Sequence, residues 1–494
     1  MTSYSRARST TVRAVEGAKQ PIERGTWLAL IAMGIAVFVI ANDFSAINVA
    51  IPQVESDFET DVSTAQWVVN AYALTFGVMI VTGGRLADIF GRTRTFFVGS
   101  AIFASMSLAG ATAPTEAWLI VARVLMGIGG AMMWPAILGM TYSALPTERA
   151  GLAGGVILGA AGIGNAAGPL IGGVLTDLAS WRWIFYLNVP VTLFAVYVTW
   201  RHVHQPRPER GPDDRMDYPG IAAISIGLVA LLLAFDEVIK LGWGDPRIIG
   251  LIVLSMSLLV AFSFLERRAG GHALVPADVM RNRDFSYSCA AILLMSAVFF
   301  ASLLYLPQFM LKVLEFSPIQ AGLGMLPMMA TFAAISFVSG PLYERFGPKP
   351  LVSLGSLCIT VGPALISLLV SEESYLAIVP GLVVLGLGIG LFYPTATTAG
   401  VTAVDESRRS LAGAIVYMFQ IAGGSVGLGL TTTVLTEAGE GKGADAFIDG
   451  LEVAFRLDAA LAVFGFLISI LLIGGRPHLP SRRVMGHSPR GHGP

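Results

Sequence analysis

Hydrophobic residues along this chain gather into fourteen long runs that are separated by short polar segments. Each run is close to the ~20 residues with which an α-helix crosses the hydrocarbon layer of a membrane. The pattern therefore predicts an all-α membrane protein with fourteen transmembrane helices. We expect these helices near residues 27–51, 66–86, 95–113, 117–142, 151–176, 183–201, 219–235, 247–265, 286–311, 319–340, 350–370, 375–400, 410–435 and 455–474.

The composition agrees with this pattern, because 54% of the 494 residues are hydrophobic and only 13% are charged. Soluble domains carry about 25% charged residues, so a soluble fold is excluded. Residues 1–26 contain several bases but no short apolar core, and the apolar run after them is too long for a signal peptide. We expect them to form a basic tail.

The distribution of basic residues predicts the orientation of the chain in the membrane. Short cytoplasmic loops hold an excess of Lys and Arg. If the N terminus is cytoplasmic, 25 of the 32 basic residues fall on the inner side. Because fourteen is even, we expect both termini in the cytoplasm and the protein in the cell (inner) membrane.

A loop pattern occurs once in each half of the chain, as G-x-L-x-acid-x-F-G followed by a base. It follows the second run and the tenth, which predicts two six-helix bundles, as in duplicated transporters. We expect bundles at 27–201 and 286–474, two inserted helices at 219–265, linkers at 202–218 and 266–285, and a tail at 475–494. The residues expected to control conformational change in these loops are Gly84, Asp88, Gly91, Arg92, Glu344 and Arg345.

Asp43 is a lone carboxylate inside the first run, and Arg123 is the only basic residue inside any run. A charge near the centre of a membrane helix costs roughly 2.5 to 3.5 kcal/mol on insertion scales, so it persists where it faces a cavity or a partner. Arg123 lies ~9 Å and Asp43 ~13 Å from the outer ends of their runs, so both lie in the outer half of the membrane at similar depth. Asp43 is therefore either a proton or cation site or half of a permanent ion pair. Asp458, the other acid within a run, is expected at the outer end of 455–474.

The fifth run contains glycines at a spacing that allows a neighbouring helix to approach closely, and a proline that permits a bend. A helix that flexes and still packs tightly suits a transporter that opens alternately to the two sides. The residues concerned are Gly164, Gly168, Pro169 and Gly172.

These motifs together resemble those of a known family. The loop from Gly84 to Arg94 resembles the signature of the major facilitator superfamily, and the R-x-x-x-G-x-G motif that starts at Arg123 is similar to one that its proton-coupled exporters use in proton transfer. The glycine pattern of the fifth run resembles the antiporter motif of drug exporters. The segment from Asp43 to Pro52 is similar to the D-x-T-x-x-N-x-A-x-P signature of the fourteen-span drug:proton antiporter family, with Ser45 in place of threonine.

The resemblance implies a proton-coupled antiporter that exports amphipathic drugs or lipophilic organic cations from the cytoplasm by alternating access. Asp43 and Arg123 would couple transport to protons, and the proton gradient would be the energy source, without a cofactor. Two alternatives remain open: a dedicated exporter of one natural product, lipid or siderophore, and a non-transporting membrane receptor or scaffold.

Candidate substrate-binding residues are polarisable or aromatic side chains and amides within the runs. Met and aromatic groups can re-pack around different ligands and offer π faces to organic cations. The candidates are Asn42, Asn48, Trp67, Tyr72, Met126, Trp134, Tyr305, Gln308, Phe309, Met325, Phe392, Tyr393, Tyr417 and Gln420.

Other functional classes have little support in the sequence. All six histidines lie in loops or tails, and Cys289 and Cys358 form no C-x-x-C pair, so no metal site is expected. We find no nucleophile elbow or phosphate loop in a suitable context, so we expect no enzyme. The Arg-rich segment 476–490 is expected to contact anionic lipid rather than nucleic acid. The expected partners are small amphipathic molecules, protons and membrane lipid, and we expect a monomer.

Overall fold

A computed structural model describes residues 23–60, 62–203, 216–269, 273–275, 277–439 and 444–473. These residues are almost entirely helical and contain no strand, and 14 of the helices are long and apolar enough to cross a membrane. The predicted fold class is thus confirmed. Most of the predicted tail 1–26, most of the linker 202–218 and the tail 475–494 lie outside the described residues.

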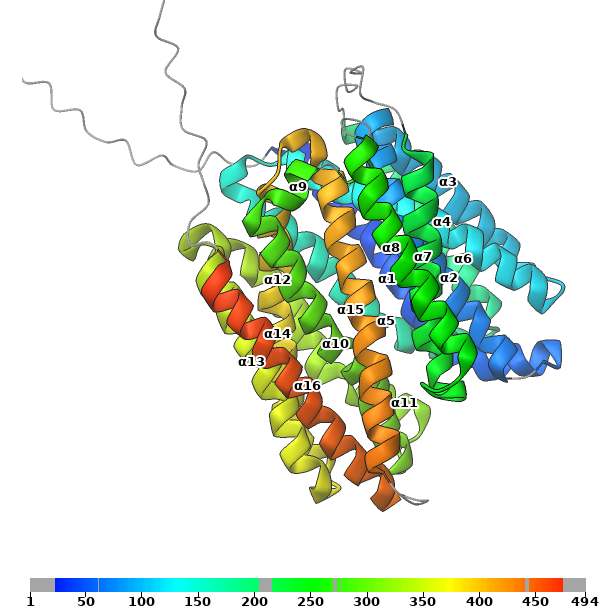
Figure 1. The fold of residues 1–494 in the computed structure, drawn as a ribbon. Helices are drawn as coiled ribbons and strands as arrows, with labels where there is room; N and C mark the ends of the chain where they lie inside the picture. The colour runs from blue at the N-terminus through cyan, green and yellow to red at the C-terminus, as the bar shows by residue number, and fades with distance from the viewer. Residues whose placement is uncertain are drawn as a thin grey trace, which may run out of the picture.

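The helices follow the chain in two groups of six, with a pair between them (Figure 1). The first group comprises α1 (Arg24–Phe58), α2 (Val62–Phe90), α3 (Arg92–Ala111), α4 (Glu116–Ala144), α5 (Ala150–Leu178) and α6 (Arg182–His202), and we call it the N-half. The pair is α7 (Tyr218–Leu241) and α8 (Pro246–Ala269). The second group, the C-half, comprises α10 (Arg283–Lys312), α12 (Leu326–Phe346), α13 (Pro348–Leu369), α14 (Tyr375–Thr402), α15 (Arg409–Ala438) and α16 (Ala444–Leu472). Short helices α9 (Ala277–Arg281) and α11 (Pro318–Gly324) precede α10 and α12.

We call the end of the bundle where α1 begins the basal end, and the end where α1 stops the distal end. The turns between α2 and α3 and between α12 and α13 lie at the basal end and correspond to the two copies of the loop pattern. The last glycine of each copy, Gly91 or Gly347, has a positive φ, of 100° and 79° respectively. A side chain rarely adopts this conformation, which explains why both copies end in glycine.

Two predicted spans differ from the structure. The run at 319–340 is divided, because the short helix α11 ends at Gly324 and α12 starts at Leu326 with Pro327 in its first turn, where a missing N–H costs nothing. The last span begins earlier than expected, since α16 starts at Ala444 rather than near residue 455. Asp458 is therefore fourteen residues into a helix of 29, near its middle and not at its outer end.

The inserted hairpin is attached to the bundle by one of its two helices. Helix α7 packs against α8 and also contacts α2 of the N-half and α15 of the C-half (Figure 1). Helix α8 is mostly exposed, and only 11% of the residues in its most apolar stretch are buried within the protein. At the distal end, the Trp243 indole N–H donates to Thr433 of α15 at 2.6 Å, and the Phe235 ring faces Gly429.

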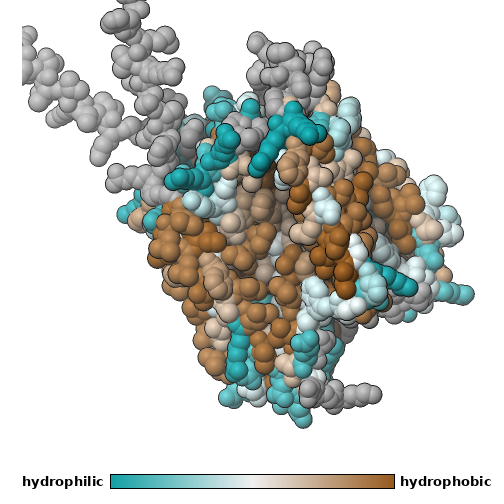
Figure 2. Space-filling model, in the orientation of Figure 1, coloured by the Kyte–Doolittle hydropathy of each residue, from teal (hydrophilic) through white to brown (hydrophobic). Residues whose placement is uncertain are grey.

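The surface carries a broad hydrophobic zone over the middle of the helices, with hydrophilic groups toward both ends (Figure 2). Large apolar side chains are exposed on helices of both halves and of the inserted pair, such as Phe194 of α6, Phe264 of α8 and Phe464 of α16. Surface of this kind is stable against lipid rather than water. The arrangement is that of a multi-pass membrane protein.

Candidate functional site

The basal ends of the two halves are joined by the Arg92 side chain, which follows the turn at Gly91. Arg92 Nε donates to the Ser410 hydroxyl at 3.0 Å, and its Nη2 donates to the backbone carbonyl of Glu406. Within the N-half, Arg92 Nη1 donates to the carbonyl of Gly139 at 3.1 Å. One guanidinium therefore connects α3 and α4 with the start of α15.

Asp88, in the same loop pattern, also reaches across to the C-half. Its Oδ2 accepts the backbone N–H of Leu411 at 2.9 Å, close to the start of α15, and its Oδ1 lies 3.6 Å from Arg92 Nε. A carboxylate is favourable there, because the first N–H groups of a helix have no intrahelical partner. Gly84 lies one turn earlier, and a Cβ added to it would lie 2.7 Å from Ala414 Cβ.

The second copy of the loop pattern makes different contacts. Arg345 is exposed, with its guanidinium carbon 5.1 Å from the centre of the Phe346 ring, and Glu344 is only partly buried. Gly340 makes the contact between halves, because a Cβ on it would lie 2.7 Å from the carbonyl oxygen of Gly151 in α5. The first glycine of each copy, Gly84 or Gly340, thus lies where the two halves pack closely together.

The glycines of α5 allow it to pack closely on α1. A Cβ on Gly164 would lie 2.7 Å from the Phe38 carbonyl oxygen, one on Gly168 would collide with the Ser45 hydroxyl, and one on Gly172 would collide with the Ala46 carbonyl. Pro169 is in the same stretch, with its Cβ 3.7 Å from the Cβ position of Gly322 in α11. Helix α5 thus lies directly against α1, the helix that carries Asp43.

Asp43 and Arg123 form a direct ion pair in the interior of the N-half. Arg123 Nη1 lies 2.5 Å from Asp43 Oδ2, and both side chains are fully buried. Arg123 Nε donates to the Val68 carbonyl at 2.7 Å, which fixes the guanidinium against α2. Asn188 of α6 donates from Nδ2 to Asp43 Oδ1 at 2.7 Å. Both carboxylate oxygens therefore have a donor.

Asn188 is a member of this site that sequence reasoning did not assign to it. Its Nδ2 also contacts the Ser107 hydroxyl of α3 at 3.2 Å, and that hydroxyl donates to the Phe185 carbonyl at 2.8 Å. The sequence feature that could have indicated it is an amide inside an apolar helix, two residues before Pro190. The ion pair is thus held by α1, α2, α4 and α6, with α3 behind it.

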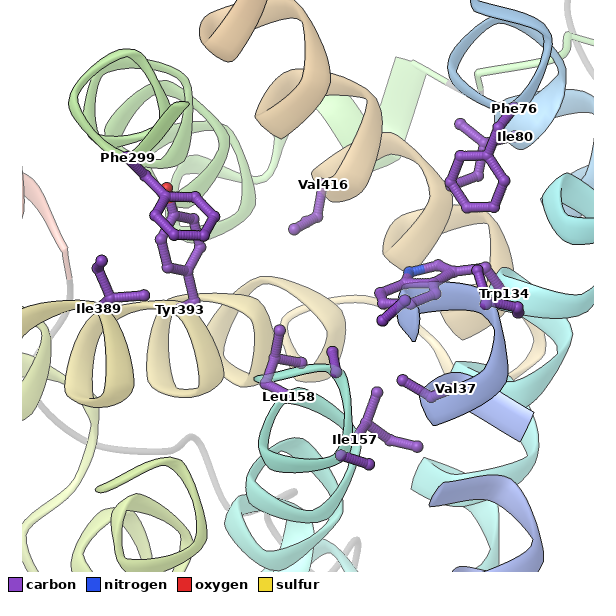
Figure 3. Close-up of a cluster of buried hydrophobic side chains, with 14 of the residues drawn as sticks. Val37, Phe76, Ile80, Trp134, Ile157, Leu158, Phe299, Ile389, Tyr393 and Val416 are labelled. Atoms are coloured by element: carbon purple, nitrogen blue, oxygen red, sulfur yellow. The ribbon is translucent and has the colours of Figure 1, made fainter. Parts of the chain in front are cut away.

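A cavity of about 280 Å³ lies between the halves. Its walls come from α1, α2, α4 and α5 of the N-half, from α10, α12, α14 and α15 of the C-half, and from α7. None of the described side chains that line it is charged. Figure 3 shows Phe76 and Trp134 across this region from Phe299 and Tyr393, with Leu158 between the two pairs. A cavity of this composition suits an apolar or aromatic solute.

Tyr72 separates the ion pair from the cavity. It lines the cavity, and the centre of its ring is 4.3 Å from the guanidinium carbon of Arg123. The Tyr72 hydroxyl has no hydrogen-bond partner within the described part of the chain. A single aromatic ring therefore lies between a buried charge pair and a space large enough for a small organic molecule.

Comparison with known proteins identifies the family. The profile of the Major Facilitator Superfamily matches residues 33–427 and, in a second match, residues 287–490. The chain belongs to the major facilitator superfamily. The resemblance inferred from its motifs is thereby confirmed, and this membership makes it a transporter and not an enzyme.

Several relatives within the superfamily are resistance proteins. The chain is 34% identical to the puromycin resistance protein of Streptomyces alboniger, over 90% of each chain. It is 31% identical to the lincomycin resistance protein of Streptomyces lincolnensis, over 95% of this chain and 94% of the relative. It is 32% identical to the multidrug resistance protein Stp of Mycobacterium tuberculosis, over 84% and 76%.

A solved structure of a superfamily member shares the fold. The human organic anion transporter MFSD10 superposes with a TM-score of 0.63 at 13% identity, covering 91% of this chain and all of the solved chain. At this identity the likeness concerns the arrangement of helices alone.

In the structure of the present chain, only some of the predicted substrate-binding residues line the cavity. Six of them line the cavity: Trp67, Tyr72, Trp134, Tyr393, Tyr417 and Gln420. The others lie outside its lining: Asn42, Met126, Tyr305, Phe309, Met325 and Phe392 are buried among helices, Asn48 is exposed, and Gln308 is partly buried and accepts a hydrogen bond from Lys312 at 3.0 Å. The two candidate amides of α1 do not reach the cavity, because Asn42 is buried among packed helices and the Asn48 side chain donates to the Phe44 carbonyl at 2.8 Å.

The cavity also contains residues that the sequence did not single out. Phe299 and Phe332 come from the C-half, and Asn165 comes from the glycine-rich helix α5. Helix α7 contributes Leu232, Leu233 and Phe235. An amide in the middle of an apolar run was a usable signal for Asn165, whereas the α7 residues are ordinary apolar positions.

Proposed function

We propose that this protein is a proton-coupled antiporter that exports amphipathic drugs or lipophilic organic cations from the cytoplasm by alternating access. The observation that carries the proposal is the position of Tyr72 between the Asp43–Arg123 ion pair and the uncharged cavity. Bound substrate and bound proton then act on the two faces of one aromatic side chain. The resistance proteins among the relatives support drug export.

The coupling follows from the charge on Asp43. A proton on Asp43 removes the negative charge that Arg123 faces, and a buried cation without a counter-charge is unfavourable. The N-half then favours a different arrangement, in which Arg123 finds new partners and the basal contacts of Arg92 and Asp88 release. Loss of the proton restores the ion pair and the arrangement in this structure.

The basal end is the cytoplasmic end in this proposal, since the predicted cytoplasmic loops lie there. Its closure by Arg92 and Tyr142, whose hydroxyl is 2.9 Å from that of Thr398, corresponds to a state that has released substrate outward. The protein acts as a monomer in the cell membrane, with both termini cytoplasmic. It needs no cofactor, because the proton gradient supplies the energy.

The cavity lining, uncharged in the part of the chain that the structure describes, favours neutral or monovalent lipophilic substrates over divalent cations, since no described side chain there compensates a second charge. Export of a single natural product is the second candidate function. It is favoured by the relatives that are named for one antibiotic each, puromycin and lincomycin.

Substrate-triggered proton release tests the proposal. Everted vesicles or proteoliposomes with wild type and the Asp43→Asn variant are given a panel of lipophilic cations and neutral drugs, and the internal pH is followed. Release by several unrelated compounds, lost in the variant, supports a multidrug antiporter. Release by one compound only supports the dedicated exporter. No response from folded wild type contradicts the proposal and leaves the receptor or scaffold alternative.

A further inference from the structure

Asp458, in the middle of α16, is a second acid buried within the helical bundle. Its side chain is fully buried, and its Oδ1 accepts a hydrogen bond from the Thr431 hydroxyl of α15 at 2.7 Å. Among the residues that the structure describes, its Oδ2 has no hydrogen-bond partner and no base lies within ion-pair distance of it. Asp43, by contrast, has both Arg123 and Asn188.

The charged groups on the described parts of the helices around α16 form no ion pair with Asp458. On α10, Lys312 has its ammonium 4.7 Å from the centre of the Phe447 ring, which is eleven residues or ~16 Å along α16 from Asp458. Arg456 of α16 itself is more than half exposed and pairs with Glu452. The charged and titratable groups of the other packed elements are Lys349 and Cys358 on α13, Arg409, Tyr417 and Glu437 on α15, the exposed Glu372 after α13, and Arg283, Asp284, Tyr287, Cys289 and Tyr305 on α10.

One of these groups, Tyr305, is bound to the same segment of α15 as Asp458. Thr431 donates to Asp458, and the adjacent Thr432 hydroxyl is hydrogen-bonded to the Tyr305 hydroxyl. Thr432 also donates to the Leu428 carbonyl at 2.7 Å, and Leu428 lines the cavity. Two adjacent threonines of α15 thus bind Asp458 and Tyr305 separately, and Thr432 lies one helical turn from Leu428 in the cavity wall.

We propose that Asp458 is a second proton-binding site, which holds its proton in the conformation seen here and releases it when the C-half changes conformation. An ionised carboxylate at this position has neither a cation nor a full set of donors, whereas the neutral acid removes the charge. The step is a simple protonation, in which Oδ2 gains or loses H⁺. The proposal rests on the proton coupling proposed above, and it gives each half of the transporter its own acid.

A second proton changes the charge that moves in each cycle. Exchange of one proton for one monovalent cation moves no net charge, whereas exchange of two protons moves one positive charge inward. Transport of a monovalent cation by the wild type is then driven by the membrane potential as well as by the pH gradient. In an Asp458→Asn variant it responds to the pH gradient alone.

Infrared difference spectroscopy of the purified protein at rising pH tests the site directly. We expect the C=O band of a protonated carboxyl that disappears reversibly in wild type, persists as a titrating band in Asp43→Asn and is absent in Asp458→Asn. A band that does not titrate, or one that survives in Asp458→Asn, overturns the proposal. Because this reading needs no transport, it remains informative even if drug export fails.

The proton-to-substrate ratio, measured from reversal potentials in proteoliposomes, gives the second reading. It should fall by one in Asp458→Asn, and an unchanged ratio contradicts the proposal.

Thr431→Val is the companion variant if Asp458→Asn does not fold, because it removes only the donor to Oδ1. It should shift the frequency of the carboxyl band, and an unshifted band places the titrating acid elsewhere.

Discussion

Replacement of Asp43 by Asn removes the negative charge of the buried ion pair while keeping the size of the side chain. Arg123 then stays in place with no exposure, bound to the Val68 carbonyl at 2.7 Å but without a counter-charge. Breaking one partner out of a buried pair costs about 3 to 5 kcal/mol. Since the Asn oxygen still accepts from Arg123, we expect a loss of free energy of unfolding of about 3 kcal/mol, at the low end of that range.

The matched control is the double variant Asp43→Asn with Arg123→Gln, in which neither charge is present. We expect this variant to regain most of the stability lost by the single variant, because a neutral pair leaves no uncompensated ion. Proton-coupled export should be lost in both variants, while both are expressed and inserted.

Thermal unfolding in detergent and substrate-triggered proton release in everted vesicles are the two assays. The reasoning is refuted if Asp43→Asn exports normally. It is also refuted if Arg123→Gln further lowers the stability of Asp43→Asn, because the cost then arises from lost hydrogen bonds and not from an uncompensated charge.

Three further predictions concern the packing around this site. Gly168→Ala should lower stability by about 1 to 3 kcal/mol and reduce transport, because its Cβ collides with the Ser45 hydroxyl; Gly173→Ala, where space is available, is the control, and equal thermal stabilities would contradict the packing. Arg92→Ala should favour opening of the basal end, read as faster labelling of cysteines introduced there, and unchanged labelling would exclude the clamp. Tyr72→Ala should let protons leak through liposomes without substrate, whereas Tyr72→Phe should stay tight; leak rates equal to wild type in both would show that the ring is not the barrier.

The sequence was sufficient for those features in which one residue type has few alternatives. The loop pattern ends in glycine in both copies, and both of these glycines, Gly91 and Gly347, have a positive φ. Asp43 and Arg123 were predicted at similar depth, and they touch. A charge within an apolar run has few stable environments, so an opposite charge at the same depth was a candidate partner.

The cavity lining was less predictable, for a physical reason. In a membrane protein, both the lipid-facing and the interior faces of a helix are apolar, so the periodicity that reveals the buried face of a soluble helix is weak. Phe299 and Phe309 are ten residues apart on α10 and are chemically identical, yet only Phe299 lines the cavity. The start of α16 was missed because the polar residues before 455 continue the helix beyond the apolar run.

Helix α7 determines what a solute in the cavity touches on one side. It covers the line along which α2 and α15 meet, with Leu232, Leu233 and Phe235 in the cavity wall. In a bundle without the hairpin, that line would face acyl chains, whose length and saturation change with growth conditions. Here the boundary is part of the polypeptide, so protein side chains determine the shape of the wall and the surrounding lipid does not.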